Sequence, residues 1–403
     1  MARRAREDDG FEIQGQIGEG AFGRAVNAWT DAYYRRVGRV YAIKTFKAPP
    51  TSTSGREQMV GLPAPTVREV TMLRAMKHEN VVRLHKVIVD KAELSLSIAI
   101  DYAEYDLGAI LTWHRRHRRY VHPRMVKSAT WQLLHGLWYL HSNWIIHRDI
   151  KPQNVLVMGD GSECGVVKIA DFGLARFVDP ASVLRPLHEN GPVVTLWYRA
   201  PELLLGARHY TRAIDIWAAG CIFAELVTLV VPFKGIPKEK EDPRTMYQYE
   251  QLESIVKHKG TPTVDQWPLV IDHPYYDKAK SCLFADSQSE LVKPDERAPM
   301  RDKALAPEIR HVFEELCAYD PEKRPTAYEA LTDFDYFAKD DPEPKRNIFD
   351  YEGNAGDARV VYPHRKIVQA EKPHDDEIKR KASDGGSDQT ATREEGEVKR
   401  TRV

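Results

Sequence analysis

The chain has 403 residues, of which 59 are basic and 59 acidic, so its formal net charge at pH 7 is zero. No global field draws it to nucleic acid or to a membrane, and we expect neither as a direct partner. With 42% hydrophobic residues the chain can bury a large core, and its length exceeds what a single core usually fills, which predicts two lobes or domains.

The cysteines and the N-terminal residues indicate the cellular compartment in which the protein is expected. Cys164, Cys221, Cys282 and Cys317 are too scattered for a metal-ligand spacing and too few for a disulfide scaffold. Residues 1–10 are highly charged and lack an apolar signal region, and no uncharged run approaches the roughly 18 residues of a membrane span. We expect a soluble protein of a reducing, intracellular compartment, with residues 1–10 disordered.

The first lobe is predicted to begin as antiparallel sheet. Residues 11–47 alternate apolar and polar residues between Gly-rich breaks, a pattern typical of hairpin-linked strands. Residues 49–61, rich in Pro, Ser, Thr and Gly, predict a loop. Residues 66–77 have the apolar spacing of a helix, and residues 81–100 return to strand-like runs.

The second lobe is predicted to be mostly α-helical. An apolar stripe at helical spacing begins near Met125, and helical segments continue towards Leu331. The polar, Pro-bearing connectors 234–247 and 271–303 carry no motif that can be interpreted. Residues 371–403 include 17 charged and no aromatic side chains, so they bury too little surface to offset their ordering entropy, and we expect them to be disordered.

A glycine-rich segment, residues 18–23, matches G-x-G-x-x-G, whose glycines let backbone N–H groups approach phosphate oxygens. Alone, the motif fits an ordinary glycine-rich hairpin nearly as well. The dinucleotide-binding version needs a helix after the last glycine and an acidic residue about 20 positions on. Here a strand pattern continues and Lys44 stands at that distance, which is the order found in protein kinases.

A second set of motifs follows in the order that kinases use. Residues 147–154 match H-R-D-x-x-x-x-N, residues 171–173 are Asp-Phe-Gly, and residues 200–202 are Ala-Pro-Glu. Five motifs with the expected spacing do not recur by coincidence. The chain resembles the protein kinases, and this implies an α+β, bilobal fold with an antiparallel β N-lobe that carries one key helix and a mostly α-helical C-lobe.

The resemblance implies phosphoryl transfer from ATP with Mg²⁺. Asp149 would accept the proton of the substrate hydroxyl, and Lys151 would contact the γ-phosphate; a lysine at this position is typical of Ser/Thr kinases. Asn154 and Asp171 would bind Mg²⁺. A lone Asp-Lys pair is more often a surface salt bridge, and only the surrounding motifs favour catalysis.

For ATP, Lys44 would hold the α- and β-phosphates with Glu69 as its ion-pair partner, and residues 100–103 resemble the hinge that contacts adenine. Ala25 departs from the usual valine of the glycine-rich loop. The implied ATP-contacting residues are Ile17, Gly18, Glu19, Gly20, Ala21, Phe22, Gly23, Arg24, Ala25, Ala42, Lys44, Glu69, Asp101, Ala103 and Leu156.

Other motif residues are expected to be structural. His147 would pack and hydrogen-bond within the catalytic loop instead of acting as an acid or base. Glu202 and Arg324 resemble the ion pair that anchors the activation segment, and Asp215 resembles the carboxylate that holds the catalytic-loop backbone.

Residues 65–69 and 193–202 resemble those of the cyclin-dependent kinases, over about residues 11–338. Longer runs, residues 143–149, 155–159 and 203–217, resemble the Mediator-associated branch of that family, and the charged tail resembles its fungal members. This implies a C-type cyclin and other Mediator kinase-module subunits as partners, and a nuclear location. The substrates implied are the C-terminal domain of RNA polymerase II and transcription factors.

The implied domains are an N-lobe at 11–100, a hinge at 101–106, a C-lobe at 107–338 and a charged, largely disordered tail at 339–403. In this family a pocket made by Val193, Val194 and Arg199 accepts proline after the phosphoacceptor. Substrates are therefore expected at Ser/Thr-Pro sites.

Two phosphorylation switches of the cell-cycle relatives are absent, since this chain has Ala21-Phe22 and Asn190 where those kinases carry the modified residues. Arginines that resemble their phosphothreonine-binding cluster are nevertheless present: Arg68, Arg148 and Arg176. Two guanidinium groups about 5 Å apart repel by roughly 3 kcal/mol at an effective dielectric near 20. The cluster thus needs an anion, either Glu189 or a cyclin carboxylate, and we favour the cyclin.

Two alternatives to the main interpretation stay open: a cyclin-binding scaffold that acts without catalysis, and a cell-cycle or elongation kinase, which Ala21-Phe22 and Asn190 disfavour. The basic clusters 379–381 and 399–400 are interpreted as solvated charge or as a nuclear-import signal. The basic run 114–119 is interpreted as a solvated helix end in preference to a docking site for an acidic partner.

Overall fold

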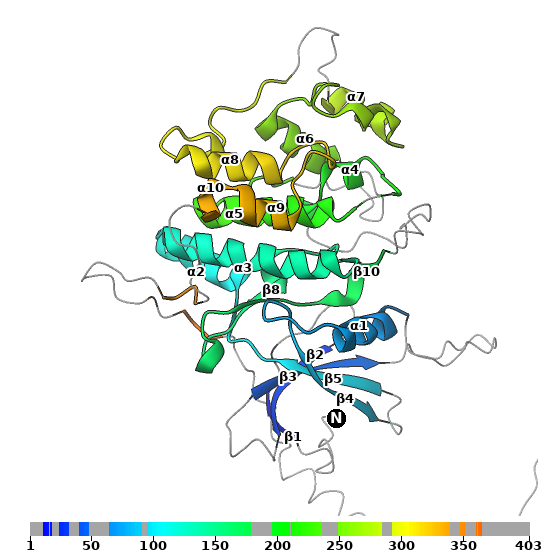
Figure 1. Cartoon of the computed structure of the whole chain (residues 1–403), viewed down its shortest axis with the longest axis vertical. Coiled ribbons are helices and arrows are strands. Elements are labelled where there is room, and N and C mark those ends of the chain that lie inside the picture. Colours follow the sequence, from blue (N-terminus) through cyan, green and yellow to red (C-terminus); the bar gives the residue numbers. More distant parts are fainter. Residues whose placement is uncertain are drawn as a thin grey trace, which may run out of the picture.

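The computed structural model describes residues 11–15, 17, 24–31, 40–47, 64–90, 95–178, 196–209, 211–235, 249–283, 292–338, 347–350, 360 and 362–364. The described chain forms two lobes, a sheet with one helix against it and a larger helical lobe (Figure 1). The predicted bilobal α+β architecture is therefore confirmed.

The N-lobe is a five-stranded sheet in the order β1-β2-β3-β5-β4, with every neighbouring pair antiparallel. Residues alternate between the two faces of β5, and Leu96 and Ile98 are buried in the main core. Strands that follow one another in the chain are neighbours in the sheet, except that β3 pairs with β5 and not with β4. The strands are β1 (Phe11–Gly15), β2 (Arg24–Asp31), β3 (Val40–Lys47), β4 (Leu84–Asp90) and β5 (Ser95–Asp101).

Helix α1 (Ala64–Ala75) forms where the apolar spacing predicted it, two residues earlier at its start. Thr66, Glu69, Leu73 and Met76 are buried, and they recur at three- and four-residue intervals along one face. Glu69 is thus a carboxylate on the packed face of the helix, where only a cation from the sheet can neutralise it. That cation is supplied by β3, as the site geometry shows.

The C-lobe is organised around α5 (Ala213–Thr228), in which every residue from Ala213 to Leu226 is buried. Helix α3 (Pro123–Ser142) packs against it and against α9 (Ala327–Asp333). The other helices of the described C-lobe are α2 (Leu107–His117), α4 (Pro201–Leu204), α6 (Tyr249–Lys259), α7 (Tyr276–Leu283), α8 (Pro307–Leu316) and α10 (Asp335–Ala338).

Short strands carry the functional loops between the two lobes. A three-stranded sheet joins β6 (Tyr105–Asp106), β8 (Val155–Val157) and β9 (Val167–Ile169), and a two-stranded sheet joins β7 (Ile145–Ile146) and β10 (Arg176–Phe177). The connector 271–303, which the sequence left without an interpretation, contains α7 and the 3-10 turn Pro299–Arg301, and its Ala279 and Met300 are buried.

Part of the predicted tail belongs to the C-lobe. Ile348, Phe349 and Tyr362 are buried, although the sequence analysis assigned residues 339–403 to a charged, largely disordered segment. The Ile348 N–H donates to Gly165 O at 3.0 Å, and the ring of Tyr362 meets that of Tyr105 edge-on at 5.9 Å. The prediction rested on the high charge of the whole segment and overlooked these few apolar side chains. They pack against the β8–β9 turn and against β6 of the hinge.

Residues 1–10 and 365–403, for which disorder was predicted, lie outside the described residues. Among the described helices none is long and apolar enough to cross a membrane. The described cysteines whose side chains are placed, Cys164, Cys221 and Cys317, form no disulfide with one another.

Candidate active site

The catalytic loop, residues 147–154, follows β7, which pairs with β10 so that Ile146 stands opposite Arg176. Asp215 of α5 holds the loop from below: it accepts hydrogen bonds from the N–H groups of His147 and Arg148, both at 2.9 Å, and from His141 Nε2 at 3.0 Å. Burial alone would raise the pKa of Asp215, but these donors bring it below its usual range. The sequence expectation for Asp215 matches this geometry.

Asp149 is fixed by residues of its own loop. Asn154 Nδ2 and Lys151 Nζ donate to its Oδ2 at 2.8 and 2.9 Å, and no described residue hydrogen-bonds to its other carboxylate oxygen. Burial raises the pKa of Asp149, and the charge of Lys151 offsets this only in part. The carboxylate is therefore oriented by two donors and keeps one oxygen for a proton donor such as a substrate hydroxyl.

His147 uses both ring nitrogens for structure. Nε2 donates to Ala170 O at 3.0 Å and Nδ1 accepts from the Asp149 N–H at 3.2 Å, while the ring meets fully buried Phe172 edge-on at 5.0 Å. Neither nitrogen is left for proton transfer, in agreement with the structural role expected for this residue.

Lys44 joins three elements. From β3 its Nζ reaches Glu69 Oε1 of α1 at 2.6 Å and Asp171 Oδ1 at 3.0 Å. Burial alone would lower the pKa of Lys44, but the charges of Asp171 and Glu69 raise it above its ordinary value, so the ammonium is kept. A fixed cation beside a carboxylate between the lobes suits the binding of phosphate oxygens.

Asp171 has a left-handed backbone conformation, φ 66°, and lies just before the short turn Phe172–Leu174. Burial would raise its pKa, yet Lys44 holds it below the usual range. Asp171 carboxylate oxygens and the amide oxygen of Asn154 are hard donors of the kind that Mg²⁺ takes in ones and twos, completed by phosphate and water. Groups of three or more His, Cys, Asp or Glu that could hold a metal are absent from the described chain.

The residues expected around adenine lie at the junction of the lobes. Ala42 of β3 pairs with Ile100 of β5, and Leu156 of β8 pairs with Asp106 of β6. The Asp101 N–H donates to Arg83 O at 3.2 Å. Ala103 is buried at the hinge.

The glycine-rich residues 18–23 lie outside the described residues, whereas Ile17 is half-buried at their start. The backbones of Arg24 and Ala25 on β2 pair with those of Thr45 and Lys44. Ala25 is therefore placed directly opposite Lys44.

Glu202 and Arg324 form the expected buried ion pair. Arg324 Nη1 and Nη2 donate to the two carboxylate oxygens at 2.6 and 2.8 Å, and Nη2 also donates to Tyr319 O at 3.0 Å. The guanidinium lies over Trp217, 5.0 Å from the ring centroid. The pair ties α4 to the loop between α8 and α9.

The three arginines proposed to bind an anion come from separate elements. Arg68 is on α1, Arg148 is in the catalytic loop with φ 71°, and Arg176 is on β10. Arg148 Nη1 donates to Leu174 O at 3.2 Å. Residues 179–195, with Glu189, Asn190, Val193 and Val194, lie outside the described residues.

The basic run 114–119 lies at the C-terminal end of α2, and its residues 115–119 are exposed, as predicted for a solvated helix end. Arg115 forms an ion pair with Glu225 of α5 and its Nε donates to Leu229 O at 2.7 Å, while Tyr198 Oη donates to the other oxygen of Glu225 at 2.6 Å. His114 is buried. Glu225 lies 110 residues away from Arg115, so no local pattern could have indicated this partner.

Comparison with known proteins fits this geometry. The family model for the protein kinase domain matches residues 11–337, and Cyclin-dependent kinase E-1 of Arabidopsis thaliana is 43% identical over 363 residues, covering 89% of this chain and 72% of the relative. The chain belongs to the cyclin-dependent kinases. It is an ATP-dependent protein serine/threonine kinase, as the catalytic motifs predicted.

Other relatives of this kinase point to one branch of the family. Probable cyclin-dependent kinase 8 of Dictyostelium discoideum is 41% identical over 358 residues, covering 89% of this chain and 86% of the relative. Serine/threonine-protein kinase srb10 of Schizosaccharomyces pombe is 37% identical over 326 residues, covering 80% and 85%. Among solved structures, the crystal structure of the yeast RNA Pol II CTD kinase CTDK-1 complex superposes with a TM-score of 0.66 at 28% identity, covering 86% of this chain and 98% of that one.

Proposed function

We propose that this kinase is the catalytic subunit of a Mediator kinase module, activated by a C-type cyclin, and that it phosphorylates Ser/Thr-Pro sites in the nucleus. Its similarity to Probable cyclin-dependent kinase 8 and to srb10 over most of their lengths carries this proposal. The polymerase II C-terminal domain and transcription factors are the proposed substrates. The solved relative named as an RNA Pol II CTD kinase supports that substrate class.

The proposed mechanism divides the work among the residues described above. Asp149 orients the attacking hydroxyl and accepts its proton on the oxygen that Lys151 and Asn154 leave free. Lys44, held by Glu69, binds phosphate oxygens. Asn154 and Asp171 would hold Mg²⁺, which neutralises phosphate charge when bound. Lys151 is close enough to Asp149 to place a cation near the transferred group.

Activation by a partner is proposed from the arginines. Arg68, Arg148 and Arg176 lie on three elements that surround the start of the activation segment, because α1 packs against the Phe172–Leu174 turn and β10 pairs with β7. An anion that bound all three would join α1, and with it Glu69, to the catalytic loop. Asn190 leaves no phosphorylatable residue at the usual position, so we propose a cyclin carboxylate as that anion, with Glu189 as the alternative within the chain.

The test is phosphate transfer from MgATP to a Ser-Pro repeat peptide by the kinase alone, with a C-type cyclin, and with cyclin after Asp149→Ala. Activity in the second sample alone supports a cyclin-activated, proline-directed kinase. Equal rates on a peptide with Ala in place of Pro would contradict the proposed site preference. Silence in all three samples, with cyclin binding confirmed, would favour the scaffold.

A charge reversal at Arg176 tests the proposed anion site. Arg176→Glu places a negative charge where the anion is proposed to bind, so we expect cyclin binding to persist while cyclin-stimulated transfer is lost. Turnover of this variant equal to that of the unmodified kinase would refute the proposed anion site.

A further inference from the structure

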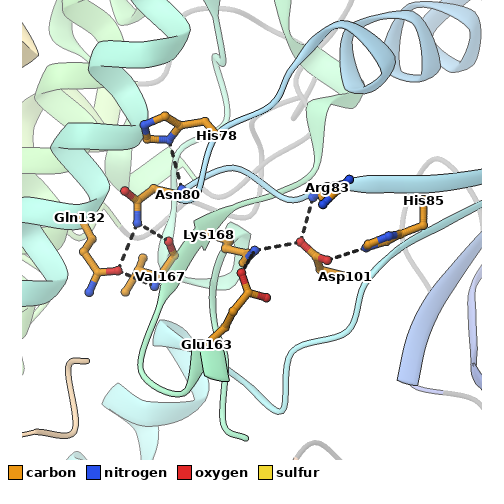
Figure 2. Close-up of polar contacts among 9 residues, drawn as sticks. All are labelled: His78, Asn80, Arg83, His85, Asp101, Gln132, Glu163, Val167 and Lys168. Atoms are coloured by element: carbon orange, nitrogen blue, oxygen red, sulfur yellow. Dashed lines mark hydrogen bonds and ion pairs between the residues drawn. The ribbon is translucent and has the colours of Figure 1, made fainter. Parts of the chain in front are cut away.

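Asp101, the last residue of β5, is where the chain leaves the N-lobe sheet and enters the hinge. Its side chain is buried in a polar cluster instead of facing solvent, and the cluster draws on both lobes (Figure 2). On the N-lobe side, the Arg83 N–H donates to Oδ2 at 2.9 Å and His85 Nε2 contacts Oδ1 at 2.7 Å. Both partners belong to β4 or to the residues that lead into it.

On the C-lobe side the partner of Asp101 is Lys168 of β9. Its Nζ lies 3.1 Å from Asp101 Oδ2 and 2.9 Å from Glu163 Oε1, and its side chain is only 5% exposed. Burial would raise the pKa of Asp101, but the hydrogen bond from His85 and the charge of Lys168 hold it below its usual range. A charged carboxylate at the hinge is thus bound to a charged lysine of the other lobe.

The two strands that this pair connects, β5 and β9, are each paired with a strand that carries a residue expected to enclose adenine. On one side, Tyr41 pairs with Asp101 and Ala42 with Ile100, so Asp101 is in register with the strand that carries Ala42. On the other side, Lys168 pairs directly with Leu156. The ion pair therefore links the strand paired with that of Ala42 to the strand paired with that of Leu156.

We infer that Asp101 and Lys168 are positioning residues for the nucleotide: their ion pair fixes the separation between β5 and the β8–β9 hairpin, and with it the width of the adenine site. The pair is buried and joins the lobes beside the hinge, where backbone hydrogen bonds between residues 80–82 and Ile169 are the neighbouring link to β9, so its loss removes one of the two constraints on this spacing. The inference depends on the proposed function only for placing adenine at the hinge.

The first experiment compares Lys168→Met with the unmodified kinase in complex with its cyclin. Methionine keeps the apolar stem and removes the charge. We expect the dissociation constant for ATP, titrated directly, and the KM for ATP to rise about 5- to 30-fold, as for coupled buried pairs. At saturating ATP, kcat should stay within about threefold, because Asp149, Lys151 and Asn154 do not contact the pair.

Three further variants make the result specific. Lys168→Arg retains the cation and should recover most of the ATP affinity. Glu163→Gln alters the solvent-exposed partner of the same lysine and should leave ATP affinity within twofold. Asp101→Asn should weaken ATP binding as Lys168→Met does, and the double variant should be no weaker than the poorer single variant, because each removes the same interaction.

Melting temperatures show whether each variant folds. If Lys168→Met does not fold, the ATP dissociation constant of Asp101→Asn tests the inference instead. An ATP dissociation constant within twofold of the unmodified value would overturn the inference, as would additive effects in the double variant or a loss confined to kcat. ATP titration needs no peptide substrate. A kinase that binds ATP but fails to phosphorylate Ser-Pro peptides would therefore refute the proposed function and leave this inference standing.

Discussion

At the scale of single residues, the site depends on two groups of side chains that contact one another. Asp149, Lys151 and Asn154 are neighbours in sequence, so the loop that carries them also arranges them. Lys44, Glu69 and Asp171 come from three elements and meet only when the lobes are packed together. The first group is local chemistry and the second is tertiary geometry, and phosphoryl transfer requires both.

Replacing Asp149 by Asn keeps the shape of the side chain and removes its basicity. We expect kcat for the Ser-Pro peptide to fall about 10²- to 10⁴-fold, the usual contribution of a general base, while the ATP dissociation constant stays within about twofold. Steady-state kinetics and ATP titration measure the two quantities. Asp277→Asn, at a fully exposed position on α7, serves as the matched control and should change neither. A variant with near-normal kcat would assign the proton to another group.

His78 predicts a dependence of stability on pH. Burial, and to a lesser degree nearby His135, lowers its pKa from 6.5 to about 4; its Nδ1 accepts the Asn80 N–H at 3.1 Å and its ring stacks on Tyr139. Below pH 6.5 the unfolded chain takes up a proton that the folded chain refuses, so the free energy of unfolding should fall as the pH drops towards 4.

Chemical denaturation at a series of pH values measures this effect. His78→Gln, which cannot titrate, should flatten the profile between pH 6.5 and 4, whereas His311→Gln at an exposed site on α8 should not. A profile with the same slope with and without His78 would show that other groups control acid stability.

At the scale of elements, the structure differs from the sequence prediction mainly where packing is long-range. Helix α1 and strands β3 to β5 follow the predicted segments because apolar periodicity records which face is buried. The connector 271–303 could not be interpreted in this way, since α7 is only eight residues long and is flanked by polar segments. The short strands β6 to β10, two or three residues long, are defined by their partners alone.

The ion pair between Glu202 and Arg324 gives a prediction for element packing. Arg324→Met leaves the Glu202 carboxylate buried without a cation, so the free energy of unfolding should fall by about 3–5 kcal/mol. Denaturant unfolding checks this value. Arg301→Met, which breaks a pair of 4.0 Å between partly exposed side chains, should cost less than about 1 kcal/mol. Equal losses in the two variants would mean that charge burial is not the cause.

At the scale of the whole molecule, the C-terminal residues extend the C-lobe to the back of the hinge. His114 Nδ1 donates to Arg119 O, and its Nε2 accepts from Tyr362 Oη at 2.8 Å. Tyr105 of the hinge strand lies edge-on to Phe349, Tyr362 and His364. The residues that follow the catalytic domain thus cover part of β6 in the hinge.

Ending the chain after residue 346 removes the buried side chains of Ile348, Phe349 and Tyr362. Each buried apolar side chain contributes about 1.5–3 kcal/mol, so the melting temperature should fall by about 5 °C or more. Ending it after residue 370 keeps these contacts and should leave the melting temperature unchanged. If the two truncated chains melted together, the packing of the C-terminal segment would not stabilise the fold.

The sequence by itself determined the family and the two-lobed architecture and predicted the catalytic residues, because these depend on residue types at short, fixed spacing and on local periodicity. Tertiary structure alone decided three contacts: Asp101 with Lys168, Arg115 with Glu225, and His114 with Tyr362, which lie 67, 110 and 248 residues apart. A charged or aromatic side chain has many possible partners at such separations. Tertiary packing brings the two members of each pair together and so selects the partner.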